Sequence, residues 1–324
     1  IPGGRYRKGG GAPLRAKMTV WLLALAFDLL VGEPPNRLHP VAWIGRLLVW
    51  GRARSWASSP AGLMATGGGV LAGVLLLVVG LAAGASWMAG RLGWPGLVLE
   101  AALLKCAFSL RGLVGAARGV TAALEKGSLE EARRRVGRDL VSRPAEELSA
   151  PHVASATVES IAENLTDSVV APFLFFLIGG LPGAWAYRVV NTADGMWGYR
   201  EGELKYLGKA AARLDDALNW IPARLAAIGI VLSAFMSGAA AGRAVIGAWR
   251  TMWSDGGRTA SPNAGWTMAA MAGALGVTLE KPGAYRLGSG PLPTARHIHR
   301  AIAVMLFASG LSVAVGLAVA ALGR

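Results

Sequence analysis

Apolar residues in this chain gather into blocks instead of alternating with polar ones. Two blocks without a charged residue, Leu63–Gly84 and Ala301–Leu322, are long enough to cross a bilayer as helices. Ala223–Gly242 is a third candidate span, with an arginine near each end. Met18–Gly32 and Ser168–Gly183 are apolar but short, which is typical of tilted or re-entrant helices. We therefore predict an all-α polytopic integral membrane protein in which transmembrane and re-entrant helices carry polar loops that form the site.

The composition strengthens this prediction. The 324 residues are 53% hydrophobic and only 16% charged, whereas soluble domains carry about a quarter charged residues. Residues 1–17 hold five basic and no acidic residues, and we expect them to be a disordered extension outside the fold. Residues 18–324 are expected to form a single membrane-embedded catalytic domain.

The net charge of +14 has a simple cause in such a chain. The basic residues flank apolar blocks, as the positive-inside rule describes, so we expect a lipid bilayer and no nucleic acid as partner. A single cysteine, Cys106, excludes an internal disulfide and a cysteine-cluster metal site.

The topology of the polar regions stays open at this point. Charged residues that could bind solutes occur in 125–147, 187–222 and 243–299. A full span at 223–242 would put the last two regions on opposite sides of the membrane. Either one region lies outside the site, or some apolar blocks enter the membrane without crossing it.

Three carboxylates stand out in an apolar segment. Glu159, Glu163 and Asp167 are spaced by four residues and share one face of a helix. Like charges in apolar surroundings need a counter-charge or a cation, and hard oxygen ligands suit Mg²⁺. We predict that they face one polar cavity as catalytic or Mg²⁺-binding groups. The alternative is a solvated helix face paired with arginines.

Further acidic residues follow. Asn191–Gly195 is predicted to be a turn that directs Asp194 into the site, unless Asn191 and Asp194 merely cap that turn. Asp215 and Asp216 could complete a metal site with Glu163, Asp167 and Asp194. The alternative for this stretch is a surface ion pair between Arg213 and Asp216.

Several residues are candidates for binding phosphates or the nucleotide. Lys205, Arg213 and Arg224 could hold phosphate oxygens, with Arg188 as a weaker candidate. The other candidates are amide, hydroxyl and imidazole groups: Asn191, Asn219, Ser261, Asn263 and His39. Ser261 and Asn263 precede a helix start that offers N–H groups, although an ordinary serine cap explains them equally. The chain holds no Walker A loop, so any ATP site is of another kind.

Five motifs in this order resemble the CbiB/CobD family, the adenosylcobinamide-phosphate synthases of cobalamin biosynthesis. They lie in Gly32–Gly45, Glu159–Pro172, Asn191–Tyr199, Ala212–Arg224 and Ser261–Gly276. No motif alone is specific, but the five together are, and the match covers about residues 25–300.

The resemblance implies an inner-membrane ligase. Such an enzyme joins adenosylcobyric acid to (R)-1-aminopropan-2-ol phosphate, or a related amino alcohol, with ATP and Mg²⁺, and yields adenosylcobinamide phosphate. It also implies a multi-pass protein whose site faces the cytoplasm, and either a homo-oligomer or association with other membrane enzymes of the pathway. The residues leave two other classes open: a transporter of a large or anionic solute, and a non-catalytic sensor of the same fold.

Overall fold

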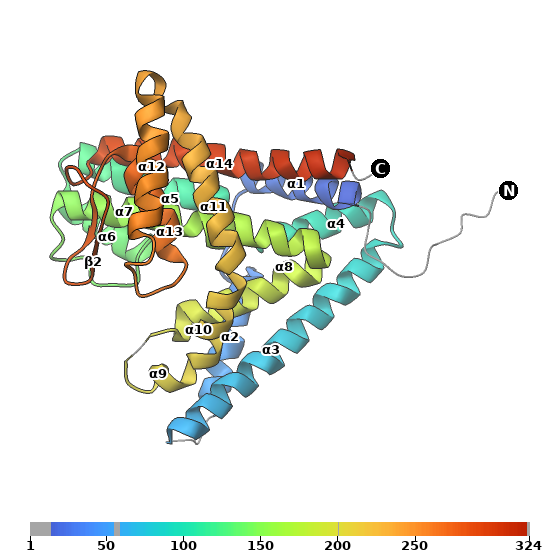
Figure 1. The fold of residues 1–324 in the computed structure, drawn as a ribbon. Coiled ribbons are helices and arrows are strands. Elements are labelled where there is room, and N and C mark those ends of the chain that lie inside the picture. The colour runs from blue at the N-terminus through green and yellow to red at the C-terminus, as the bar shows by residue number, and fades with distance from the viewer. Residues whose placement is uncertain (1–13, 55–58, 200, 323–324) are drawn as a thin grey trace.

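The computed structural model describes residues 14–54, 59–199 and 201–322 (Figure 1). The protein is 78% helical, which confirms the predicted all-α class. Its described residues also include one small antiparallel hairpin, in which β1 (Leu279–Lys281) pairs with β2 (Tyr285–Leu287). A three-residue strand is too short for its alternation to be detected in the sequence.

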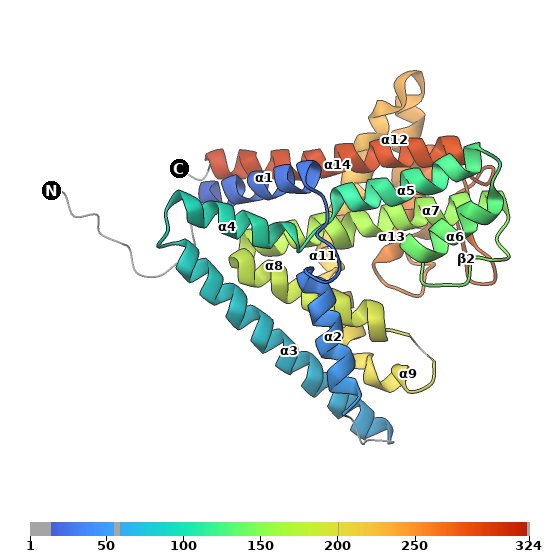
Figure 2. The same cartoon turned by 180° about the vertical axis from the view of Figure 1, so that it is seen from behind.

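Helices form the body of the molecule, and several run side by side. The helical elements are α1 (Leu14–Leu30), α2 (Pro40–Arg52), α3 (Pro60–Ala89), α4 (Trp94–Lys105), α5 (Leu110–Glu125), α6 (Leu129–Asp139), α7 (Ala150–Leu165), the π-helical η1 (Thr166–Val170), α8 (Ala171–Trp197), α9 (Leu204–Leu207), α10 (Lys209–Leu218), α11 (Trp220–Ser233), the 3₁₀-helical η2 (Ala234–Ala240), α12 (Ala241–Asp255), α13 (Ala264–Leu275) and α14 (Ala295–Leu322). In both views α14 lies along α1 and α5 (Figures 1 and 2). One buried cluster joins α5, α7, α11, α13 and α14, and another joins α1, α3, α4 and α8.

Two of the predicted spans are confirmed as long apolar helices. Leu63–Gly84 lies within α3 and Ala301–Leu322 within α14, and both helices are long and apolar enough to cross a membrane. The continuous run of α7, η1 and α8 meets the same criterion, and the bent pair of α10 and α11 would be a fourth. Leu76 in α3 is 74% exposed, as expected for a lipid-facing side chain.

The short apolar block 168–183 contains a reversal of the chain. Gly180 adopts φ +63°, and Pro182 begins the second arm of α8. The ring of Phe175 stacks on that of Tyr187 with 5.3 Å between centroids, although twelve residues of straight helix would separate them by about 18 Å. The second arm therefore folds back along the first (Figure 1).

The helix of the third candidate span, 223–242, is shorter than predicted. Helix α11 ends at Ser233, and the chain turns through η2 and returns as α12. Helices α12 and α13 approach closely, since a Cβ on Gly273 would lie 2.3 Å from the Gly247 carbonyl oxygen. The segment from α11 to α12, which we call the α11–α12 excursion, therefore leaves the body of the protein and returns to it at the same place. As a result, regions 187–222 and 243–299 lie on the same side of the molecule.

The N-terminal extension, predicted to be residues 1–17, is shorter than expected. Helix α1 begins at Leu14, so residues 14–17 belong to the fold, while residues 1–13 lie outside the described residues. Lys17 Nζ donates to the carbonyl oxygen of Leu177 at 2.8 Å, and Arg15 Nε donates to that of Ala320. These contacts place basic side chains at helix C-termini, where the dipole favours cations.

Candidate functional site

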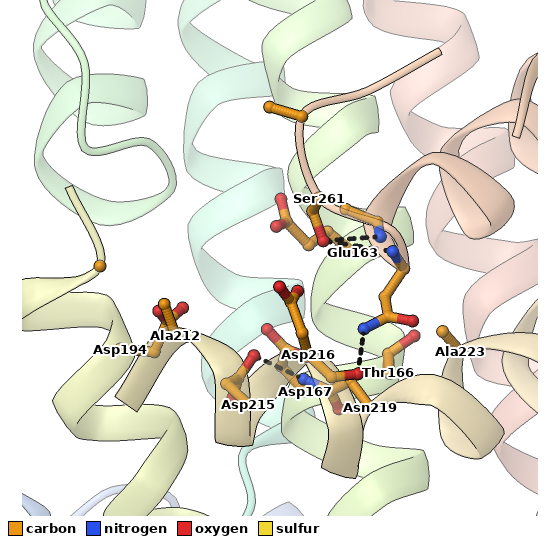
Figure 3. Close-up of a pocket in the computed structure, with 14 residues that line it drawn as sticks. Glu163, Thr166, Asp167, Asp194, Ala212, Asp215, Asp216, Asn219, Ala223 and Ser261 are labelled. Carbon is orange, nitrogen blue, oxygen red and sulfur yellow. Dashed lines mark hydrogen bonds between the residues drawn. The ribbon is translucent and has the colours of Figure 1, made fainter. Parts of the chain in front are cut away.

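Four segments that are distant in the sequence enclose an acidic cavity of about 220 Å³ (Figure 3). They are the α7–η1 junction, the second arm of α8, helix α10 and the chain around the start of α13. The polar residues that line it are Glu163, Thr166, Asp167, Asp194, Asp215, Asp216, Asn219, Ser261 and Asn263. We call it the acidic cavity below. The reversal at Gly180 brings Asp194 back to the cavity that Asp167 also lines.

A buried hydrogen-bond network orients the carboxylates. Asp215 accepts from Asn219 Nδ2 at 2.9 Å and from Asn191 Nδ2 at 3.3 Å. The Tyr187 hydroxyl lies 3.0 Å from Asn219 Oδ1 and 3.3 Å from Asp167 Oδ1, so it donates toward either oxygen. The tyrosine and the two amides hold Asp167 and Asp215 at fixed positions, which pre-organises the cavity.

The π-helical segment η1 changes the direction of two side chains. One extra residue per turn shifts Thr166 and Asp167 relative to a regular helix, and such segments often occur at functional sites. Thr166 lines the acidic cavity and is 4% exposed, and its Oγ1 has no hydrogen-bond partner among the described residues. A buried hydroxyl without a partner is costly unless a ligand or water satisfies it.

The start of α13 closes the cavity from the other side. The Ser261 hydroxyl accepts from the N–H groups of Asn263 and Ala264, as the serine-cap alternative describes. Asn263 Oδ1 accepts from Arg224, whose guanidinium also lies between the rings of Trp220 and Trp266. Arg224 is not among the cavity-lining residues, so it acts on the site by positioning Asn263.

The structure does not bring Glu159 into the acidic cavity, which corrects the prediction of three carboxylates in one cavity. Glu159 is buried and accepts from Ser155 at 2.7 Å and from Tyr285 at 2.8 Å. Arg143 Nη2 lies 3.4 Å from the same carboxylate. Burial and then the charge of Glu159 raise the pKa of Tyr285, which keeps its hydroxyl a donor. Glu159 therefore anchors the β1–β2 hairpin to α7.

A second cavity of about 370 Å³ lies next to the acidic one. It contains Lys205, Lys209 and Arg213, and we call it the basic cavity. Gly208 also lines it, where a Cβ would lie 1.9 Å from the Trp197 carbonyl oxygen, so only glycine permits this approach of α10 to α8. The alternative ion pair between Arg213 and Asp216 does not occur among the ion pairs of the described residues.

His39 lies outside both cavities, in contrast to its predicted anion-binding role. Its Nδ1 accepts from the Val41 N–H and caps α2, so Nε2 donates to Glu33 at 2.9 Å. Burial would raise the pKa of Glu33, but hydrogen bonds from His39, Lys105 and Ser109 outweigh it and lower that pKa to about 2. His39 thus belongs to a structural ion cluster at the α1–α2 connection.

The turn predicted at Asn191–Gly195 is wrong, because these residues continue α8 to Trp197. Arg188 Nη1 donates to Asn191 Oδ1 at 3.0 Å, and Asn191 in turn donates to Asp215. The amide therefore bonds across to α10 instead of to its own backbone, and tertiary contacts override the local turn preference. Asn191 also lines a shallow pocket that opens onto Glu163 and Asp194.

The carboxylate oxygens around the acidic cavity are not arranged as a complete set of metal ligands. Among the described residues, no three His, Cys, Asp or Glu side chains converge as a ready metal-ligand group. The donor set of carboxylates, one hydroxyl and amide oxygens is nevertheless the kind that Mg²⁺ prefers, with water completing its shell. Acidic side chains dominate this cavity, and basic side chains dominate the adjoining basic cavity.

Sequence reasoning missed three residues of the site. Thr166 and Tyr187 carry ordinary polar groups in apolar segments, and only the fold directs them to the carboxylates. Lys209 lacked a motif of its own, but its spacing of four residues before Arg213 on a helix was a signal that could have revealed it.

Comparison with known proteins agrees with this architecture. The model of the CobD/CbiB family, described as "CobD/Cbib protein", matches residues 21–305. The chain belongs to the CobD/CbiB family. It is an all-α membrane protein of that family.

Curated relatives cover most of the chain. A protein of Dehalococcoides mccartyi named "Cobalamin biosynthesis protein CobD" is 43% identical over 84% of this chain and 86% of its own length. One of Chromobacterium violaceum with the same name is 40% identical over 93% of this chain and 96% of its own. A protein of Methanothermobacter thermautotrophicus named "Probable cobalamin biosynthesis protein CobD" is 42% identical over 84% of this chain and 87% of its own length. No solved structure gave a significant match.

Proposed function

We propose that this protein is an ATP-dependent acid–amine ligase of cobalamin biosynthesis. It joins adenosylcobyric acid to (R)-1-aminopropan-2-ol phosphate, or a related amino alcohol, and forms adenosylcobinamide phosphate. The observation that carries the proposal is the acidic cavity with the basic cavity at its wall, in a chain of the CobD/CbiB family. Both charges are needed, because the reaction brings together anionic phosphates and a cationic amine.

The chemistry explains this need. A carboxylate does not react with an amine at neutral pH unless it is activated. Transfer of the ATP γ-phosphoryl group to the carboxylate releases ADP, and attack by the amine nitrogen on the acyl carbon then releases phosphate. The ammonium must first lose a proton to a base, and a carboxylate of the acidic cavity is suited to accept it.

Mg²⁺ would be held by the deeper carboxylates. Glu163, Asp167, Asp194 and Asp215 supply oxygen ligands, and Asp216 lies toward the basic cavity. Thr166 lines the same cavity, and its hydroxyl, which has no hydrogen-bond partner among the described residues, would offer one more oxygen. When bound, Mg²⁺ supplies neutralisation of the ATP phosphates. Tyr187, Asn191 and Asn219 keep the carboxylates oriented.

The charge distribution supports a cytoplasmic site in the inner membrane. Helix α6 carries Arg133, Arg134, Arg135 and Arg138, and it lies with the hairpin at the opposite end of the molecule from the C-terminus (Figure 1). The positive-inside rule favours the α6 end in the cytoplasm, where ATP is present. Helices α8 and α10 line both cavities, and the start of α13 also lines the acidic one.

The test is synthesis of the amide by purified protein in detergent. Adenosylcobyric acid, Mg·ATP and each amine are incubated together, and the product is identified by its mass. We expect amide and ADP in equal amounts, loss of both in Asp215→Asn, and normal synthesis in Glu130→Gln, whose carboxylate lies on exposed α6. A folded wild-type protein that forms no amide with any amine would contradict the proposal, and flux of a corrinoid into vesicles without ATP cleavage would favour the transporter.

A further inference from the structure

A third cavity, of about 730 Å³, lies at the end of the molecule near the C-terminus and shares no lining residue with the acidic and basic cavities. It is enclosed by the start of α1, the turn between α3 and α4, and the reversal of α8. Figures 1 and 2 show these segments gathered beside the end of α14. We call it the α3–α4 cavity. Volumes of about 300–1,000 Å³ are typical of sites that bind small molecules.

The rim of the α3–α4 cavity faces hydrocarbon. Trp87 and Ile178 line it and are 66% and 69% exposed, and Trp94 at the start of α4 is exposed as well. The guanidinium of Arg91 stacks over Trp87, 3.2 Å from the ring centroid. Tryptophan and arginine at the end of a membrane span are typical of the headgroup level of a bilayer. A ligand that enters this cavity therefore comes from the bilayer.

Two side chains of opposite charge line the same cavity. Neither Lys17 nor Glu100 forms an ion pair with any residue that the structure describes. Ser86 Oγ donates to Glu100 Oε1 at 2.9 Å, and Lys17 Nζ donates to the carbonyl oxygens of Leu177 and Ile178. These bonds leave a carboxylate oxygen and an ammonium hydrogen for a ligand, and both charges are costly beside lipid. A zwitterion complements this pair of charges better than an anion does.

The rest of the lining is apolar or glycine. Val20, Ala83, Leu97 and Phe176 continue the wall away from the two charges. A Cβ at Gly179 would meet no atom within 4 Å, so the described residues leave space at the reversal of α8. An acyl chain is suited to this space, because it gains dispersion contacts with walls of close-packed apolar atoms.

We infer that the α3–α4 cavity binds one molecule of phosphatidylethanolamine. Its phosphate lies at Lys17, its ammonium at Glu100, and one acyl chain along the apolar wall. The lipid fills the space beside the reversal at Gly180 and so supports the second arm of α8, which carries Asp194 to the acidic cavity. The inference does not rest on the proposed function, because lipid retention and thermal stability test it without any turnover.

The experiment uses the full chain, purified in detergent and stripped of lipid. Phosphatidylethanolamine, phosphatidylcholine and phosphatidylglycerol with identical acyl chains are added singly, bound lipid is counted by native mass spectrometry, and Tm is measured. Phosphatidylcholine has no N–H donor, and phosphatidylglycerol has no cation. We expect one phosphatidylethanolamine to bind at least about tenfold more tightly than either other lipid, the difference that one charge-assisted hydrogen bond provides. At saturation it should raise Tm by roughly 5 °C.

Charge variants should separate the two ends of the headgroup. Glu100→Gln retains an acceptor for Ser86 but loses the charge, so it should weaken phosphatidylethanolamine about tenfold and leave phosphatidylcholine unchanged. Lys17→Gln should weaken all three lipids to a similar degree, because all three carry the phosphate. Glu130→Gln and Lys126→Gln change exposed residues outside the cavity and should alter no affinity.

A pair of alanines on α3 tests the apolar wall. Ala83 and Ala72 are both exposed, but only Ala83 lines the cavity. Ala83→Phe should abolish retention of the lipid, whereas Ala72→Phe should retain it. Equal affinities of wild type for the three lipids would overturn the inference, and this comparison needs no substitution. Binding of phosphatidylethanolamine that is unchanged in both Glu100→Gln and Ala83→Phe would also overturn it, because the lipid would then lie elsewhere on the surface.

Discussion

Asn263 Nδ2 donates a hydrogen bond of 2.7 Å to the backbone carbonyl oxygen of Asp216, 47 residues earlier in the chain. This bond joins the start of α13 to α10 across the whole α11–α12 excursion. It closes the acidic cavity and explains why both polar regions flanking that excursion contribute to one site.

Asn263→Ala should weaken the contact between α13 and α10 that closes the acidic cavity. The variant loses the bond to Asp216 and leaves the Arg224 guanidinium without its amide acceptor. We expect a loss of stability of about 1–3 kcal/mol, the usual cost of a buried polar group that loses its partner, and a lower kcat. Thermal unfolding in detergent and the ligase assay measure the two effects. Asn36→Ala, at an exposed turn, is the control and should change neither.

Glu163→Gln and Glu159→Gln should have opposite consequences. Glu163 is one of several like charges around the cavity, so its neutralisation should leave Tm unchanged or raise it while activity falls by about a hundredfold or more. Glu159 accepts bonds from Tyr285 and Ser155, so its neutralisation should lower Tm and leave a smaller loss of activity.

The Mg²⁺ dependence of Glu163→Gln identifies its role. A need for more Mg²⁺ would indicate that Glu163 is a ligand, whereas an unchanged need with a rate that rises with pH would indicate that it is the base for the amine. Near-normal activity in Glu163→Gln, Asp167→Asn and Asp194→Asn, each tested singly, would exclude both roles.

Thr166→Val should separate binding from stability. The Thr166 hydroxyl has no hydrogen-bond partner among the described residues, so an isosteric apolar side chain should leave the free energy of unfolding equal or slightly higher. The same change should weaken the ligand that the hydroxyl contacts and lower kcat/KM by about tenfold. Thr166→Ser retains the hydroxyl and should retain activity. A large drop in Tm for Thr166→Val would show that the hydroxyl is structural.

Glu33 should make stability depend on acid pH. Its pKa is lowered from 4.5 to about 2 in the folded protein, so the folded state binds fewer protons than the unfolded state between these values. The stabilisation is fully present above about pH 4.5 and is lost as pH falls toward 2. Glu33→Gln should therefore unfold at lower temperature than wild type at pH 6, and the difference in Tm should shrink below pH 4.5. A difference that stays constant down to pH 3 would contradict this assignment.

The family membership, the all-α class and the two long spans could all be predicted from the sequence. Apolar length and the absence of charge are properties of a single segment, and a helix satisfies its own backbone in a bilayer, so Leu63–Gly84 and Ala301–Leu322 require no knowledge of their neighbours. The carboxylates were visible for the same reason. Charge in an apolar stretch is local information, and it marked Glu163, Asp167 and Asp194, which the structure places around one cavity.

Only the tertiary structure decided which of these residues meet. Glu159 and Glu163 share a helix face in the sequence pattern. In the structure, Glu159 accepts a hydrogen bond from Tyr285 of the hairpin, whereas Glu163 lines the acidic cavity. The reversal at Gly180, the return of α12 and the wall at Asp216 that the acidic and basic cavities share arise from contacts between segments tens of residues apart. Such contacts depend on how side chains pack and satisfy one another across the fold, and no local pattern of spacing or composition carries that information.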